Sequence, residues 1–196
     1  MEFDALYRKY EALLVSLKSI IVKSQDRVLS DELDDIFSEN INFFVKSYLI
    51  TMCTYLEAYL QDVAFEHTYR VSQRLKAAKI PHNFLYWKLS KDIKEKELSF
   101  ENASYSCTKK DISDVISGNP YKTIKAFQLV GVNLYDNPGF NQRKPLINTI
   151  VTKRNSIIHH NDDASDISFN DLVNNIDIVL LYMKSIDTIL SADIHE

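Results

Sequence analysis

Apolar residues recur at spacings of three and four along most of the chain, which is the period of an amphipathic α-helix. The first such stretch runs from Phe3 to Ile21, and Ser30-Asp31-Glu32 after it has the residue types of a helix start. The longest stretch runs from about Glu39 to Ala78 and contains no glycine or proline. It predicts a helix of about 60 Å, with a kink or break near Tyr69 left open. We expect this helix to be the spine of a bundle.

The pattern is less regular in the segment from 81 to about 140. Short helices are predicted at Asn83–Lys94, Lys109–Ser117 and Tyr121–Val130. Turn residues separate them at 102–106, 118–120 and 136–139. We interpret 81–140 as a loop-rich helical insertion between the bundle helices.

Regular helical spacing returns in the C-terminal third. Leu146 to Ile158 predicts a helix that ends near two histidines. Ser168-Phe169-Asn170-Asp171 resembles a capping box and opens a last helix that reaches Leu190.

Composition supports the same fold class. All-β folds need a turn about every 8–12 residues, and this chain has only 3 glycines and 4 prolines in 196 residues. The length fits one domain with a substantial core. We therefore predict one all-α domain spanning 1–196.

The formal net charge is −4, so a binding site for a polyanion must be a local patch. The segment 141–160 has four cations and no carboxylate, whereas 162–177 has five aspartates and no cation. The four cations are Arg143, Lys144, Lys153 and Arg154.

The cysteines and the N-terminus point to a reduced, cytoplasmic setting. Cys53 lies in an apolar run and is expected to be buried, and its spacing from Cys107 does not suggest zinc. The first residues lack a signal-peptide pattern, and no run of about 18 apolar residues predicts a membrane span. We expect a soluble protein that needs neither a metal nor a cofactor and has no membrane partner.

The most reactive set of side chains is Arg154, Asn155, His159 and His160. A guanidinium stabilises charge on phosphate oxygens, and an imidazole transfers protons near neutral pH. Asn155 and His159 are four residues apart on one helical face, so the amide is placed to hydrogen-bond the imidazole. This set suits the cleavage of a phosphodiester.

Two features keep other interpretations open. Cationic groups at a helix C-terminus are favoured by the helix dipole, which explains both histidines without an active site. Arg154 and His159 are five residues apart, about 140° around the axis, so one regular helix separates them. Two copies facing each other could bring them together, and so could a helix that unwinds at its end.

The run Arg154-Asn155-Ser-Ile-Ile-His159, with the Ser-x-x-Asp helix after it, resembles the signature of HEPN domains. The run from Tyr48 to Leu60 is similar to the second helix of the branch called RiboL-PSP-like or MAE-type. The resemblance covers about 40–80 and 141–192.

The resemblance implies an antiparallel four- to five-helix bundle, with short extra helices between the long ones, that forms a homodimer. Each copy would contribute one Arg-x4-6-His helix to a shared cleft. Arg154 would stabilise the phosphate and the transition state, His159 would act as general acid or base, and Asn155 would be the polar residue beside the arginine. His160, where the family has a small or polar residue, could share or replace the role of His159.

Other residues carry weaker signals. Glu57 lies either on the polar edge of its helix or in the cleft, paired with Arg154 or a histidine. The candidates for contacts with RNA phosphates are Lys122, Lys125, Arg143, Lys144 and Lys153, and the alternative is that they are ordinary scattered surface cations.

The remaining histidines and the aromatic cluster are assigned to structure. His67 is expected on the surface, His82 in a loop and His195 in the tail. Trp87 and Phe84 are expected to pack in a core, with stacking on unpaired bases as the alternative.

The predicted function is a metal-independent endoribonuclease of a prokaryotic defence or toxin–antitoxin system. It would bind RNA as a homodimer, and an antitoxin or another defence protein would be its partner. The alternative is a HEPN-like subunit without catalysis that mediates dimerisation or partner binding. Binding of a free nucleotide is disfavoured, because the chain has no glycine-rich phosphate cradle.

Overall fold

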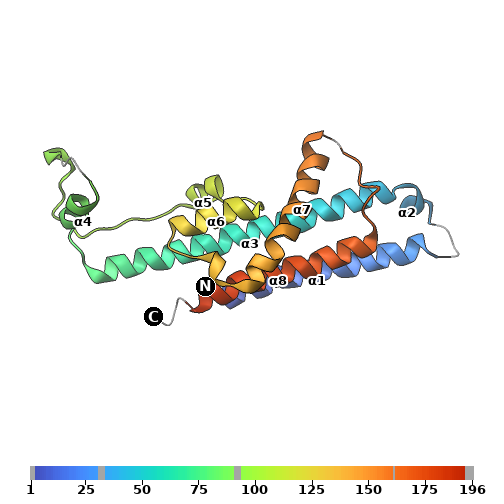
Figure 1. The fold of residues 1–196 in the computed structure, drawn as a ribbon, viewed down its shortest axis with the longest axis horizontal. Coiled ribbons are helices and arrows are strands. Elements are labelled where there is room, and N and C mark those ends of the chain that lie inside the picture. Colours follow the sequence, from blue (N-terminus) through green and yellow to red (C-terminus); the bar gives the residue numbers. More distant parts are fainter. Residues whose placement is uncertain (1–2, 31–33, 91–93, 161, 193–196) are drawn as a thin grey trace.

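The computed structural model describes residues 3–30, 34–90, 94–160 and 162–192. These residues form eight α-helices and two short 3₁₀ helices, so the all-α prediction is confirmed (Figure 1). None of the described helices is both long and apolar enough to cross a bilayer.

Four long helices build the bundle. They are α1 (Phe3–Val28), α3 (Ile41–Ala78), α7 (Pro138–His160) and α8 (Phe169–Ala192). α3 and α8 run in the opposite direction to α1, and α7 crosses α3 obliquely (Figure 1). Fully buried side chains such as Leu14, Leu56 and Ile186 fill the space between them. This burial is the main favourable contribution to folding.

α3 is one continuous helix. It passes through Tyr69 without the break left open above and ends at Lys79. Lys79 takes the left-handed conformation with φ of 51°, and its N–H donates to the carbonyl of Lys76, which caps the helix C-terminus.

The first helix is longer than its apolar stripe predicts, because α1 continues to Val28. The predicted helix start at Ser30-Asp31-Glu32 falls partly outside the described residues. The next helix, α2 (Asp35–Glu39), begins after Asp34, whose side chain accepts a hydrogen bond from the Ile36 N–H.

The start of α8 confirms the predicted capping box. The Asp171 N–H donates to Ser168 Oγ at 3.1 Å, and the Ser168 N–H donates to Asp171 Oδ2 at 2.9 Å. Two otherwise unpaired backbone donors are satisfied in this way.

The segment between α3 and α7 has two structurally different parts. Its elements are α4 (His82–Leu89), η1 (Glu95–Glu97), α5 (Lys109–Val115), α6 (Pro120–Leu129) and η2 (Leu134–Asp136). The part formed by α5, α6 and η2 packs into the same core as the long helices through Ile112, Phe127 and Leu134. The part formed by α4 and η1 does not, because neither element has a buried residue.

Three assignments from the sequence are wrong. His82 is the first residue of α4 and does not lie in a loop. His67 is buried, with 5% of its surface exposed, because it follows Val63 by four residues on the core face of α3. Its Nε2 lies 3.1 Å from the carbonyl oxygen of Val130. Trp87 and Phe84 are 57% and 51% exposed, not packed in the core, since α4 lies away from the bundle. Cys53 is buried as predicted.

A polar contact between α1 and α3 provides a test of this packing. The Tyr10 hydroxyl donates to Asp62 Oδ2 at 2.7 Å, and Lys9 Nζ donates to the same oxygen at 3.1 Å. Burial by itself would raise the pKa of the Asp62 carboxyl. The hydrogen bonds from Tyr10 and Lys9 have the larger combined effect, so the pKa lies below its usual value. The carboxylate therefore stabilises the fold above the pKa of the unfolded chain, and this stabilisation is lost as pH falls through the folded pKa.

We expect Asp62→Asn to lower the free energy of unfolding at pH 7 by about 1 kcal/mol. The deficit should shrink as the pH falls below about 5 and disappear in acid, since the wild-type carboxyl is then protonated too. Urea unfolding of wild type and variant at pH 7 and in acid measures this difference in the free energy of unfolding. Asp114→Asn, on the exposed face of α5, is the control. An equal deficit at both pH values would contradict the proposed role of the charge.

Candidate functional site

The helix that carries the Arg-Asn…His run ends away from the bundle. The C-terminal part of α7 extends past α3 (Figure 1). In its last four residues only Ile157 is buried, whereas Ile158, His159 and His160 are exposed. Both histidines therefore lie in the last turn of a helix end that is open to solvent.

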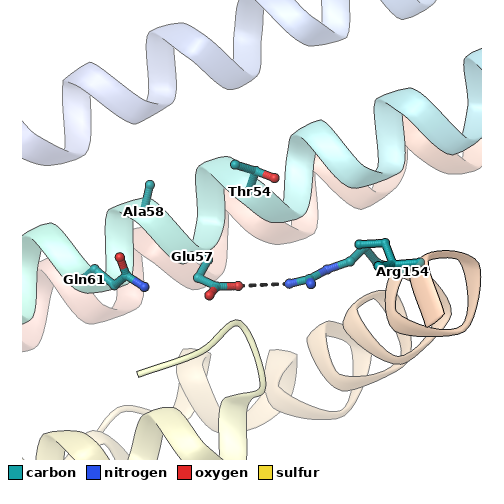
Figure 2. A pocket seen from close by; sticks show the side chains of 6 residues that line it. Thr54, Glu57, Ala58, Gln61 and Arg154 are labelled. Atoms are coloured by element: carbon teal, nitrogen blue, oxygen red, sulfur yellow. Dashed lines mark hydrogen bonds and ion pairs between the residues drawn. The ribbon is translucent and has the colours of Figure 1, made fainter. Parts of the chain in front are cut away.

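Arg154 faces the bundle and pairs with Glu57 of α3. Its Nη2 lies 2.9 Å from Glu57 Oε2 (Figure 2). The two side chains are 18% and 31% exposed, so the pair is only partly screened by water. Of the two positions considered for Glu57 from the sequence, the structure has the one paired with Arg154.

An open cavity of about 280 Å³ lies beside this ion pair. Both α3 and α7 line it, and the lining residues are Thr54, Glu57, Ala58, Gln61, Arg154 and Ile158. Figure 2 shows the Glu57 and Arg154 side chains extended toward each other across the space between the two helices. The charges of Arg154 and Glu57 cancel in this wall, and Thr54 and Gln61 add neutral polar groups beside the apolar Ala58 and Ile158.

The loop before α6 lies against the arginine. A Cβ added to Gly118 would lie 3.7 Å from Arg154 Nη2 and 3.4 Å from Val151 Cγ2. Arg154 Nε is buried and has no hydrogen-bond partner within the described residues. The guanidinium is thus held on several sides but keeps one donor unsatisfied.

Cys53 lies one turn before Glu57 on α3 and close to the same guanidinium. Burial raises the pKa of the Cys53 thiol to about 11, against the opposing effect of Arg154. A thiol with this pKa is protonated at neutral pH and is a poor nucleophile. Cys53 therefore packs the core behind the site.

His159 does not reach the cavity from the same copy. The helix separates it from Arg154 by about 140°, and the cavity wall includes Ile158 but neither histidine. Within the described residues, Asn155 and His159 make no hydrogen bond to each other, so the predicted bond is not formed. Asn155 is half-buried and His159 is exposed, so the two side chains lie in different environments.

The cations expected to contact RNA do not gather at this site. Lys153 Nζ lies 2.8 Å from Asp166 and donates to the Asp163 carbonyl at 2.6 Å, which holds the connection between α7 and α8. Arg143 donates to the Gly139 carbonyl at 2.8 Å, and Lys144 lies over the rings of two tyrosines. These two residues are at the other end of α7, about 23 Å from His159 along the axis.

Lys122 and Lys125, the other two lysines expected to contact RNA, are exposed on α6. Neither of them lines the cavity beside Arg154.

The acidic turn after α7 is bonded internally. Asp162 Oδ1 accepts the Asp163 N–H at 3.0 Å, and Asp163 Oδ1 accepts the Ala164 N–H at 2.8 Å. Across the part of the chain that the structure describes, no three His, Cys, Asp or Glu side chains form a cluster suited to a metal ion. The turn carboxylates are therefore accounted for as backbone caps.

Three residues of the site were not identified from the sequence. Gln61 follows Glu57 by four residues and Thr54 precedes it by three, so both lie on the face of α3 that lines the cavity. Helical spacing from Glu57 would have found them once its orientation was known. Gly118 had no such signal, because only the fold brings its loop to Arg154.

The family model described as RiboL-PSP-HEPN matches residues 7–192, and the chain belongs to this family. Searches of the curated proteins and of the solved structures return no match.

The ion pair predicts an energetic coupling between α3 and α7. We expect a double-mutant cycle of Glu57→Gln and Arg154→Gln to give a coupling energy of about 1 kcal/mol in the free energy of unfolding. The coupling should fall as salt is raised, because part of the pair is exposed. Urea unfolding of the four proteins at low and high salt measures it. Additive effects at low salt would show that the two side chains do not stabilise each other in solution.

Proposed function

We propose that this protein is a metal-independent endoribonuclease that acts as a homodimer and cuts RNA by attack of a 2′-OH. The observation that carries this proposal is the position of Arg154. It lies in the wall of an open cavity, fixed by Glu57, on the same projecting helix end that exposes two histidines. A scaffold alone has no physical need for this set.

RNA itself supplies the nucleophile. A neutral imidazole removes the proton from the 2′-OH, the 2′ oxygen bonds to phosphorus, and the bond from phosphorus to the 5′ oxygen breaks. A protonated imidazole gives its proton to the leaving 5′ oxygen. Arg154 stabilises the negative charge on the phosphorane oxygens. The products are a 2′,3′-cyclic phosphate and a 5′-hydroxyl, and DNA is not cut.

Glu57 would position the guanidinium in this scheme. A carboxylate with two oxygens can hold one edge of the planar guanidinium while the remaining donors bind a phosphate. Arg154 Nε is buried, so a phosphate would bind the Nη donors of the guanidinium that Glu57 leaves unused. His159 and His160 are both candidates for each proton transfer.

A second copy is needed to complete the site. One α7 places Arg154 toward the cavity and His159 away from it. If two exposed helix ends meet about a twofold axis, the imidazole of one copy can approach the arginine of the other. The exposure of Ile158, at 47%, supports an apolar contact at this end.

We place the enzyme in the cytoplasm, in a prokaryotic defence or toxin–antitoxin system, with an antitoxin or another defence protein as its partner. Membership of the RiboL-PSP-HEPN family supports a nuclease-like function, and the defence setting is proposed from the sequence resemblance. Toxicity on expression of the wild type, but not of Arg154→Ala or His159→Ala, would be consistent with it.

A catalytically inactive subunit that mediates dimerisation or partner binding is the second candidate. One observation favours it: Glu57 neutralises Arg154 in a chain whose formal charge is already −4. Such a subunit would dimerise normally and leave RNA intact.

RNA cleavage in EDTA tests the first proposal. We expect the wild type to cut single-stranded RNA in EDTA and to leave 2′,3′-cyclic phosphate ends. Arg154→Ala and His159→Ala should each lower the rate by at least about 100-fold, through loss of charge stabilisation or proton transfer. Gel electrophoresis of end-labelled RNA, with and without a 2′-deoxy substitution at the cut position, measures this.

Lys23→Ala, on the exposed face of α1, is a matched control and should cut normally. Cleavage that survives both substitutions would remove Arg154 and His159 from the mechanism. Loss of cleavage in EDTA would point to a metal-dependent enzyme. His160→Ala shows which imidazole carries the larger effect.

Mixing the two inactive variants tests whether copies share a site. If Arg154 of one copy works with His159 of the other, each mixed dimer has one intact site. Reassociation of equal amounts of Arg154→Ala and His159→Ala should then restore about a quarter of the wild-type rate. No recovery, in a mixture whose subunit exchange is verified by labelled chains, would mean that the two residues act within one copy.

A further inference from the structure

The C-terminal end of α3 leaves the bundle. The last buried residue of this helix is Thr68, and none of the residues from Tyr69 to Ala78 is buried. Figure 1 shows these turns extending beyond the ends of α1 and α8, with α4 at the tip. Arg70 still lies over the Phe3 ring, and Val71 and Ser72 line a cavity with Val130. The turns from 73 to 78 bury no residue, so core packing does not explain them.

An arm follows this helix and returns to the bundle. We define the arm as the described residues 80–90 and 94–103. Its base is closed by two backbone hydrogen bonds, from His82 N–H to the Glu101 carbonyl at 3.0 Å and from Ala103 N–H to the Ile80 carbonyl at 2.7 Å. Farther out, the Ser99 N–H donates to Asn83 Oδ1 at 2.8 Å. The arm thus has its own internal bonds and is not a plain loop.

The arm exposes aromatic rings. Phe84 and Trp87 of α4 lie edge to face, with ring centroids 6.3 Å apart, and about half of each side chain is exposed. Phe100 on the returning limb is 97% exposed. Lys88 Nζ lies 4.1 Å from the centre of the Trp87 ring. Rings with a cation beside them are suited to stacking on nucleobases.

The charge of this region is opposite to that of the whole protein. From His67 to Lys91 there are six cations and no carboxylate. From His67 to Asn102 there are eight cations and four carboxylates, a formal charge of +4, although the chain as a whole carries −4. Lys76, Lys79 and Lys88 are exposed. A polyanion is therefore the ligand that this surface favours electrostatically.

We propose that the end of α3 and the arm form a binding surface for single-stranded RNA, separate from the cavity at Arg154. This inference rests on the proposed ribonuclease function for the choice of RNA. Stacking requires unpaired bases, so a duplex should bind poorly. Lys76 lies about 29 Å along α3 from Glu57, so one strand could contact both regions only if several nucleotides separated them. The surface would therefore favour long substrates over short ones.

Trp87 is the only tryptophan of the chain, so its fluorescence reports on this surface alone. The protein used is the full chain with Arg154→Ala, which prevents cleavage during the titration. We expect single-stranded oligonucleotides to quench Trp87, with RNA and DNA of the same sequence comparable, because stacking does not read the 2′-OH. A duplex of the same length should quench far less.

Fluorescence anisotropy of labelled RNA gives the affinities. The pair Phe84→Ala and Trp87→Ala should weaken binding by at least about 10-fold. The pair Lys76→Ala and Lys88→Ala should lower the slope of log affinity against log salt by about one. Lys23→Ala with Lys110→Ala, two exposed lysines of α1 and α5, is the matched control and should change neither. Circular dichroism confirms that each variant is folded.

RNA that binds with normal affinity while Trp87 stays unquenched, or while the aromatic pair is removed, would overturn the proposal. Quenching by a duplex equal to that by a single strand would also overturn it. Quenching of Trp87 by RNA that the wild type does not cleave would support the binding surface and contradict the proposed ribonuclease activity. If the enzyme is active, replacing both Phe84 and Trp87 by alanine should slow cleavage of long RNA at limiting RNA concentration. Cleavage of a tetranucleotide should be unaffected.

Discussion

The ion pair between Glu57 and Arg154 is the contact on which the candidate site depends. It joins the longest helix to the helix that carries the Arg-x4-His run, at a distance of 2.9 Å. Without Glu57, the guanidinium would be a half-buried charge with no counter-ion, which proteins avoid by rearrangement. With it, Arg154 stays in the cavity wall, and the rest of α7 is free to project its histidines into solvent. The pair thus fixes one reactive group and leaves the others exposed.

The second constraint is the period of the α-helix. Two residues five positions apart on one helix point in directions about 140° apart. α7 is helical through His160, so this applies to Arg154 and His159. One copy therefore offers an arginine on its inner face and imidazoles on its outer face. Under the proposed mechanism, a second copy would supply the imidazole that acts with this arginine on one phosphate.

Two parts of α3 lie in different surroundings because the helix is long: its middle lies in the core and its C-terminal end is exposed to solvent. Its middle, around Leu56 and Tyr59, is fully buried and supports the bundle. Its end, beyond Thr68, is exposed and basic, and it carries the arm with the aromatic rings of Phe84 and Trp87. A rigid helix holds the two regions at a fixed distance of about 30 Å. The proposed RNA-binding surface and the proposed cleavage site can therefore be tested with separate substitutions.

Much of this protein followed from the sequence alone, because helices depend on local information. The period of the apolar residues predicted α3 to within two residues, Ser168 and Asp171 predicted the start of α8, and the run from Arg154 to His159 identified the family. Only the tertiary structure decided which way ambiguous side chains face. In the folded chain Glu57 pairs with Arg154, His67 is buried and Trp87 is exposed. Lys153 forms an ion pair with Asp166 in the connection between α7 and α8. Each of these outcomes depends on which other element lies opposite the residue, and spacing along one helix does not contain that information.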